Sequence, residues 1–160
     1  MNYVIRLLVP TDREEWLRLR VALWPDASMQ SQYDEMAEIL RTFDRQPVFV
    51  AVRGEAGAAQ YLCGLMEVTI HITPPPGCTT QRVGYLEAWY VDPDCRKYGI
   101  GRKLIEAAEA WSRTQGCTEM ASDTNPGYPI SPTAHQKLGY EIVLVSDGDV
   151  FFRKELRTYL

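Results

Sequence analysis

The stretch LEAWYVDPDCRKYGIGRKL, residues 86–104, constrains the fold of this chain more than any other segment. Its apolar start, as far as Val91, predicts a strand that Asp92 and Pro93 end. A short basic loop with two glycines then leads into an amphipathic helix. Glycines let backbone N–H groups approach a ligand closely, and the start of a helix adds partial positive charge. The stretch therefore predicts an anion-binding site between a strand and a helix.

The residues of this loop favour a pyrophosphate over other anions. Four basic side chains surround the glycines: Arg96, Lys97, Arg102 and Lys103. A P-loop is excluded because no Gly-Lys-Ser/Thr follows at the required spacing, and the dinucleotide fingerprint is excluded because Leu104 stands where its third glycine belongs. The remaining pattern, Arg-x-x-Gly-x-Gly after a strand, resembles the acetyl-CoA pyrophosphate loop of the GCN5-related N-acetyltransferases. The alternative interpretation is an ordinary glycine turn with exposed basic residues.

Length and charge limit the class of protein. With 160 residues the chain fits one domain, 1–160, with a sizeable core. Its net charge of −4 argues against a nucleic-acid partner, which usually requires a basic protein. No apolar run approaches the roughly 20 residues that span a membrane, and the apolar start is too short for a signal peptide. We therefore expect a cytoplasmic protein without a membrane or nucleic-acid partner.

The cysteines and histidines predict no metal site. The four cysteines are Cys63, Cys78, Cys95 and Cys117, and no two of them form a CxxC pair. The two histidines, His71 and His135, lie far apart in the sequence. We expect free thiols in a reducing compartment.

Hydrophobic patterning predicts the element order β-α-α-β-β-β-α-β-α-β-β. Strands are expected over residues 3–8, 47–52, 61–72, 83–91, 118–121, 140–145 and 150–154, the last two as a hairpin across Asp147-Gly148. Helices are expected from the capping box at Thr11–Glu14 to Pro25, then over residues 32–43, 100–116 and 131–138. This order indicates an α/β or α+β fold with a mixed sheet. It also resembles the acetyltransferase superfamily along the whole chain, which implies a mostly antiparallel central sheet flanked by helices.

Four segments carry a narrower resemblance. They are Leu23-Trp24-Pro25, Leu86-Glu87, GCTEMASDT at residues 116–124 and HQKLGY at residues 135–140. Together they resemble the chromosomal-type dimeric subgroup of the aminoglycoside 6'-N-acetyltransferases. The resemblance implies acetyl-CoA as co-substrate, an aminoglycoside as the small-molecule partner, antibiotic resistance and a homodimer.

The same resemblance implies which residues bind the substrate. Trp24 would line the aminoglycoside site, and Glu87 would contact the amines of the drug. Asp123 would be a substrate ligand and a candidate base, so that Asp123 and Glu87 are the expected catalytic pair. Thr73 stands in the loop where relatives have a tyrosine, and this difference leaves the range of drugs open.

The resemblance also implies the cofactor-binding residues. The backbone of Trp89, Tyr90 and Val91 would hold the pantetheine arm. The pyrophosphate loop would comprise Arg96, Lys97, Tyr98, Gly99, Ile100, Gly101 and Arg102. Tyr128 falls where a relative has an asparagine near the cofactor, and His135 falls where many acetyltransferases have a tyrosine near the thiolate.

The chemistry of N-acetylation gives these residues roles. The acceptor must lose a proton, because an ammonium has no lone pair, and the thioester carbonyl must be positioned and its oxyanion stabilised. We expect Glu87 and Asp123 near the carboxyl ends of adjacent strands, where ligands commonly bind. Taken singly, each residue has a structural explanation: Asp123 could cap a turn, Glu87 could be an exposed strand residue, Trp24 could staple a helix end and His135 could be solvated or capping.

Two other functions stay open from the sequence. One is the same chemistry on another amine, such as a polyamine, an amino-acid derivative or a protein N-terminus. The other is a non-catalytic module that binds acyl-CoA. Turnover assays on a panel of amines separate these functions.

Overall fold

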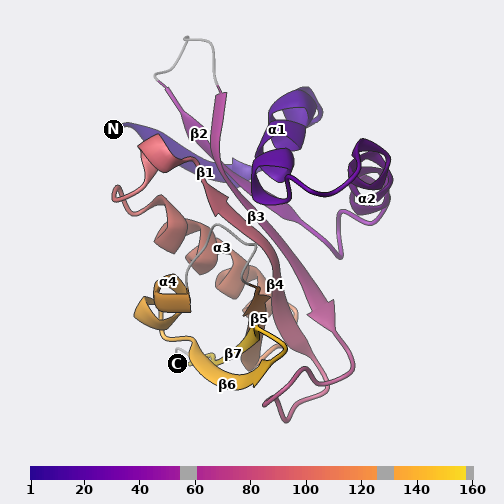
Figure 1. Cartoon of the computed structure of the whole chain (residues 1–160), viewed down its shortest axis with the longest axis vertical. Coiled ribbons are helices and arrows are strands. Elements are labelled where there is room, and N and C mark those ends of the chain that lie inside the picture. Colours follow the sequence, from indigo (N-terminus) through magenta and orange to yellow (C-terminus); the bar gives the residue numbers. More distant parts are fainter. Residues whose placement is uncertain (55–60, 126–131, 158–160) are drawn as a thin grey trace. The chain divides into compact units, whose positions relative to one another are not determined.

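A computed structural model describes residues 1–54, 61–125 and 132–157 (Figure 1). Within these residues the strands are β1 (Tyr3–Leu7), β2 (Val48–Arg53), β3 (Tyr61–His71), β4 (Val83–Val91), β5 (Glu119–Thr124), β6 (Glu141–Ser146) and β7 (Asp149–Glu155). The helices are α1 (Arg13–Leu23), α2 (Met29–Arg41), α3 (Ile100–Thr114) and α4 (Pro132–Lys137), with 3-10 turns η1 (Pro10–Asp12) and η2 (Pro93–Cys95). The predicted element order is confirmed.

The strands form one sheet in the order β1-β2-β3-β4-β5-β7-β6. β4 and β5 pair in parallel, whereas β1–β2, β2–β3, β5–β7 and β6–β7 pair antiparallel. The predicted mixed, mostly antiparallel sheet is therefore confirmed. Contacts divide the chain into two compact units, one of Met1–Glu67 with Ala88–Ala107 and the other of Val68–Glu87 with Ala108–Leu160. β3, β4 and α3 each contribute residues to both units.

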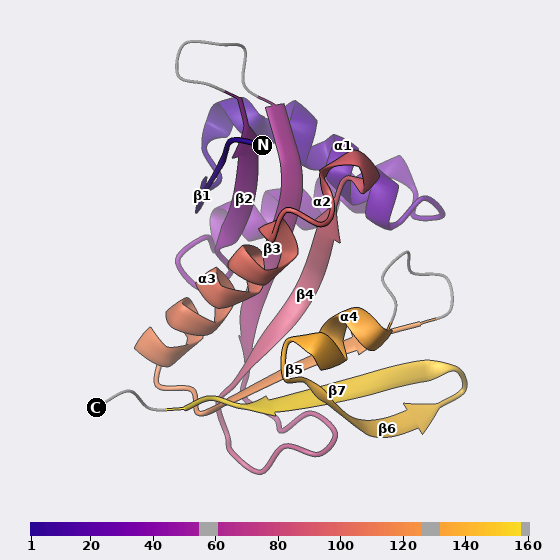
Figure 2. The same ribbon diagram turned by 90° about the vertical axis from the view of Figure 1, so that its left-hand side faces the viewer.

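In the first unit, helices cover both faces of the sheet. From α1, the indole N–H of the fully buried Trp16 donates to the carboxylate of Glu67 on β3 at 2.9 Å. From α3, Ile100 and Leu104 pack so closely on Gly64 of β3 that an added Cβ would lie 3.0 to 3.1 Å from them. Gly64 and Glu67 are three residues apart and face opposite sides of the strand. α1 and α3 therefore lie on opposite faces of this part of the sheet (Figure 2).

The starts of the first two helices differ from the prediction. The capping box at Thr11–Glu14 is wrong, because the chain makes the turn η1 there and Asp12 accepts bonds from Arg6 at 2.6 and 3.0 Å. α2 begins at Met29, where Ser28 accepts a bond from a first-turn N–H at 3.0 Å. Leu40 near the end of this helix is 46% exposed.

In the second unit, the parallel pair β4–β5 carries the core. A Cβ on Gly84 would lie 2.4 Å from the Ser112 hydroxyl and 2.5 Å from the Met120 sulfur, so only glycine allows α3 to pack this closely on β4. The β6–β7 hairpin turns at Asp147-Gly148, where both residues have positive φ, as the sequence predicts for this tight turn. β5 continues beyond its predicted end and includes Asp123, so this residue does not cap a turn.

Candidate active site

In the first unit, the loop between β4 and α3 has the backbone of an anion site. Lys97 and Gly99 both adopt left-handed conformations, with φ of 72° and 82°. A left-handed residue can turn neighbouring N–H groups toward one side of the chain, and such a turn can favour anion binding. α3 begins directly afterwards at Ile100, and its first-turn N–H groups have no acceptor within the helix. Two left-handed residues directly before a helix start are compatible with an anion site here, which stays a prediction.

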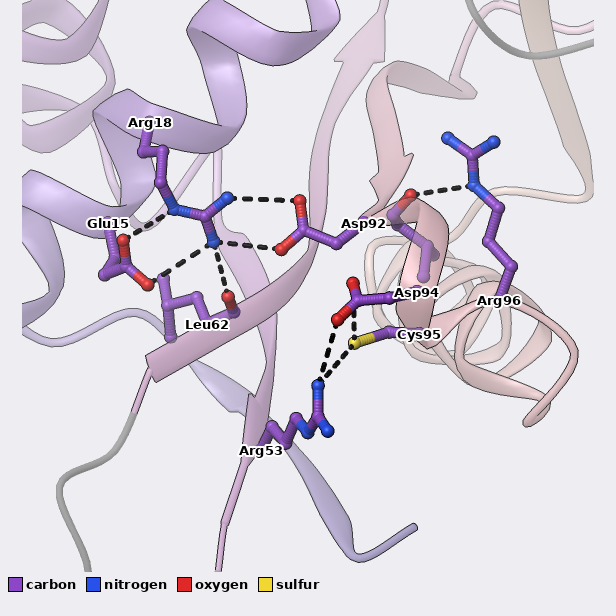
Figure 3. A network of polar contacts seen from close by, with 9 residues as sticks. Glu15, Arg18, Arg53, Leu62, Asp92, Asp94, Cys95 and Arg96 are labelled. Carbon is purple, nitrogen blue, oxygen red and sulfur yellow. Dashed lines mark hydrogen bonds and ion pairs between the residues drawn. The ribbon is translucent and has the colours of Figure 1, made fainter.

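A network of ion pairs holds the start of this loop (Figure 3). Arg18 of α1 donates to both carboxylate oxygens of Asp92, at 3.1 and 2.9 Å, and to the Leu62 carbonyl at 2.8 Å. Hydrogen bonds from Arg18 to Asp92 and then to Glu15 raise the pKa of the Arg18 guanidinium. The Asp92 N–H also donates to the Cys63 carbonyl at 2.9 Å. Asp92 therefore fixes the loop to α1 and β3 and does more than end a strand.

The basic side chains of the loop are accessible to a ligand. Arg96 is exposed, and its Nε donates to the Val91 carbonyl at 2.9 Å while its terminal nitrogens point away from the network (Figure 3). Lys97, Tyr98 and Arg102 are also exposed. These donors suit the charge of a pyrophosphate.

Gly101 has a packing role that sequence reasoning missed. Its carbonyl accepts a bond from the Trp89 indole N–H at 3.1 Å, and an added Cβ would lie 3.2 Å from the Trp89 ring. The side chains of Trp89, Tyr90 and Val91 are buried in β4. Any contact of this segment with a cofactor would therefore use its backbone, as the predicted role in holding pantetheine requires.

In the second unit, Glu87 and Asp123 lie on the neighbouring parallel strands β4 and β5. Leu86 and Ser122 pair in register, and Glu87 directly follows Leu86 while Asp123 directly follows Ser122. Tyr85, two residues before Glu87, pairs in register with Ala121, two residues before Asp123, so these positions share one face of the sheet. The expected placement on adjacent strands is confirmed, but only Asp123 lies near the carboxyl end of its strand, whereas Glu87 lies in the middle of β4.

Three further side chains belong to this carboxylate cluster, and sequence reasoning missed them. Thr69 Oγ1 donates to Glu87 Oε1 at 2.7 Å, and His71 Nε2 lies 2.8 Å from the same oxygen. The Tyr85 hydroxyl donates to Asp123 Oδ1. The His71 and Tyr85 rings stack, with centroids 4.1 Å apart and planes 11° apart. The sequence signal that groups these side chains is a spacing of two residues, because side chains two apart on a strand lie on the same face. Thr69 and His71 have this spacing, and so do Tyr85 and Glu87.

Trp24 ends α1 in the first unit and is half-buried. Its ring lies over the Arg20 guanidinium, with the guanidinium carbon 4.8 Å from the ring centroid. Arg20 is itself buried and donates to Glu67 at 2.5 and 2.6 Å and to Gln32 at 2.8 Å. The Trp24 ring therefore packs on the buried, ion-paired Arg20. This contact holds the ring in place, whether or not Trp24 also staples the end of the helix.

Thr73 is exposed in the loop between β3 and β4, and Glu119 of β5 anchors the later part of this loop. The buried Glu119 carboxylate accepts bonds from the N–H groups of Thr79 and Thr80 at 3.0 and 2.8 Å, and from Arg153 at 2.5 Å. Burial alone would raise the pKa of Glu119, but bonds from Thr80 and Arg153 lower it to about 2. The ionised carboxylate thus stabilises the folded loop.

The loop anchor predicts a pH-dependent stability. A carboxylate whose pKa is lowered on folding contributes stability above its unfolded pKa of about 4.3, and this contribution is lost as the pH falls toward 2. We expect Glu119→Gln to lower Tm at pH 7, and the gap between wild type and variant to close from pH 5 to pH 2. Thermal unfolding of both proteins across this range measures it. A gap that is constant with pH would contradict the role of the charge.

Of the two residues predicted to lie near the thiolate and the cofactor, the structure describes His135 but not Tyr128. His135 of α4 is 2% exposed, its Nε2 lies 2.9 Å from the Ser122 hydroxyl, and its ring stacks on Phe152 at 4.2 Å. The alternative of a solvated histidine is therefore wrong, whereas a contact of His135 with the cofactor stays a prediction. Tyr128 lies outside the described residues.

The described ranges contain no group of three or more His, Cys, Asp or Glu residues that could hold a metal ion. The four cysteines are free thiols, and burial raises the pKa of the Cys63 thiol to about 12. In the same ranges no helix is both long and apolar enough to cross a bilayer.

The fold agrees with the comparisons to known proteins. The model of the Acetyltransferase (GNAT) family matches residues 13–140. The chain therefore belongs to the acetyltransferase (GNAT) family.

Within this family the chain is similar to particular enzymes. It is 37% identical to an aminoglycoside N(6')-acetyltransferase type 1 of Klebsiella aerogenes, over 86% of this chain and 88% of that protein. It is 34% identical to an enzyme of the same name from Stenotrophomonas maltophilia, over 95% of this chain and 93% of that one. The structure of AAC(6')-Iy with the bisubstrate analogue CoA-S-monomethyl-acetylneamine matches with a TM-score of 0.79 and 33% identity, covering 91% and 95% of the two chains.

Proposed function

We propose that this chain is an aminoglycoside 6'-N-acetyltransferase, which acetylates the 6'-amino group of the drug and so confers resistance. The observation that carries the proposal is the carboxylate cluster of Glu87 and Asp123. One oxygen of each accepts a bond within the cluster, and the described residues donate no bond to the other. Two carboxylates with an open oxygen each suit a polycation, and the relatives named above support an aminoglycoside as that polycation.

Acetyl-CoA is the co-substrate, and the loop between β4 and α3, in which Lys97 and Gly99 are left-handed, supplies its pyrophosphate site. The N–H groups around Gly99 and the first turn of α3 would bind the phosphates, with Arg96, Lys97 and Arg102 adding charge. Acetyl-CoA, when bound, supplies the activated acetyl group. The family and the CoA-containing relative support this assignment.

The residues of the chain divide the work of the transfer. Glu87 binds ammonium groups of the drug, whereas Asp123 accepts the proton that the reacting amine must lose, directly or through a water molecule. Backbone N–H groups of residues 89–91 on β4 would stabilise the oxyanion. Trp24 and Thr73 would contact the drug, and His135 and Tyr128 would lie near the cofactor.

A turnover assay with defined amines tests this function. Thiol release from acetyl-CoA should be rapid with kanamycin, and slow with spermidine, with a peptide N-terminus and with a matched aminoglycoside that carries a hydroxyl at the 6' position. NMR of the product should place the acetyl group on the 6'-nitrogen. Acetylation of another amine would refute the regiochemistry, and binding of acetyl-CoA without turnover of any amine would favour a non-catalytic module.

We further propose that the chain acts as a single domain, forms a homodimer and is cytoplasmic. β6 is the last strand in the sheet order and exposes three apolar side chains, Ile142, Leu144 and Val145, which supports a docking edge for a second copy. We expect Leu144→Lys to shift the mass measured by light scattering from dimer to monomer. An unchanged dimer would place the interface elsewhere, and a monomeric wild type would refute the dimer.

The free cysteines support a reducing compartment.

A further inference from the structure

His71 connects the two carboxylates assigned to the drug. Its Nε2 contacts Glu87 Oε1, and its ring stacks on Tyr85, whose hydroxyl bonds Asp123. These contacts form a continuous chain from Glu87 to Asp123 within one unit. His71 is therefore placed to affect both carboxylates without being one of them.

The hydrogen bond to Glu87 fixes the protonation of the ring. An ionised carboxylate only accepts hydrogen bonds, so Nε2 of His71 must carry the proton. The Thr69 hydroxyl donates to the same oxygen at 2.7 Å. Two donors on Oε1 orient the carboxylate and leave Oε2 open, since no described residue donates to it.

The stacking contact acts on the other carboxylate. Tyr85 is 8% exposed, and the His71 ring covers one of its faces at a centroid distance of 4.1 Å. This contact limits rotation of the Tyr85 ring. The Tyr85 hydroxyl in turn holds Asp123 Oδ1 and leaves Oδ2 as the open acceptor among the described contacts.

We propose that His71 is a positioning residue for the acceptor amine. Through Nε2–H it presents Glu87 Oε2 to an ammonium group of the drug, and through its stacked ring it aims Asp123 at the amine that reacts. The identity of the amine rests on the proposed function, whereas the placement of Glu87 and Asp123 does not.

Two substitutions separate these two contributions. His71→Phe keeps a stacked ring but removes the donor, so we expect the KM for the drug to rise about threefold to tenfold, the range for losing one hydrogen bond, with kcat within twofold. His71→Gln keeps a donor at similar reach but removes the ring, so kcat should fall while KM stays near wild type. The KM for acetyl-CoA should not change in either variant. Identical effects of both variants on KM and kcat would overturn the proposal.

A double-mutant cycle with Glu87→Gln tests whether His71 acts through Glu87. If it does, His71→Phe should change KM by less than twofold in the Glu87→Gln background, because coupled residues are not additive. An undiminished effect there would indicate a general structural role and overturn the assignment. Thr69→Val, which removes the second donor with little change in volume, should raise KM in the same direction as His71→Phe.

A measurement without substrate separates this proposal from the proposed function. Nitrogen NMR of the imidazole in the ligand-free protein should show a proton on Nε2 of His71. A ring protonated only on Nδ1 would refute the bond to Glu87, whatever the enzyme acetylates. If Nε2 is protonated but the protein acetylates no 6'-amine, the proposed function is refuted. The placement of Glu87 by His71 is then still supported.

Discussion

Replacing Gly99 with valine should raise the Kd for acetyl-CoA by well over tenfold while the fold survives. Gly99 has a φ of 82°, a conformation that β-branched residues rarely adopt. Among the described residues an added Cβ would meet only the Tyr3 hydroxyl, at 3.7 Å, so the substitution distorts the backbone without overlapping any of them. The N–H groups of the loop should then no longer converge. Calorimetric titration with acetyl-CoA measures the loss, and thermal unfolding checks the fold.

Lys97→Ala is the matched control for charge in the same loop. Lys97 is exposed, and a screened surface charge contributes only about 1 kcal/mol, so its loss should weaken binding less than Gly99→Val does. Gly101→Ala tests packing, because its Cβ would press on the Trp89 ring at 3.2 Å. If Lys97→Ala abolished binding and Gly99→Val left it unchanged, the site would depend on side-chain charge and not on backbone geometry.

The sequence predicts the elements of this fold well because their signals are local. The β4 strand matches its predicted bounds, and the β6–β7 turn forms where Asp147-Gly148 predicts it. The failures arise where a distant partner competes with a local signal. Asp12 accepts bonds from Arg6 and from the Val9 N–H, and Thr11 lies inside the turn η1, so α1 begins one residue later than a capping box at Thr11 requires.

The candidate site likewise contains residues that the sequence predicts and residues that it does not. Glu87 and Asp123 could be placed together because their strands are neighbours in the expected fold. His71 and Thr69 could not be assigned to Glu87, because this contact depends on the register between strands and on side-chain rotamers. Lys97 was expected only as a basic residue, and its left-handed backbone has no signature in the sequence, since lysine has no preference for it.

The second large effect concerns Asp123. Asp123→Asn keeps the shape of the side chain and its ability to accept a hydrogen bond from Tyr85 but removes its charge and basicity. A proton acceptor of this kind contributes about 100-fold or more to the rate, so we expect kcat to fall by at least that factor. The Kd for acetyl-CoA should stay within twofold of wild type, because the loop that binds it is unchanged.

Two comparisons make the Asp123 result specific. Glu87→Gln should raise the KM for the drug more than Asp123→Asn does, because Glu87 binds the drug and Asp123 receives the proton. Tyr85→Phe removes the hydrogen bond to Asp123 but keeps a ring against His71, so kcat should fall less than in Asp123→Asn. In wild type the rate should rise with pH as the acceptor amine loses its proton. A fully active Asp123→Asn enzyme, or a flat pH profile near neutrality, would remove Asp123 as the base and leave positioning of the amine as the main source of catalysis.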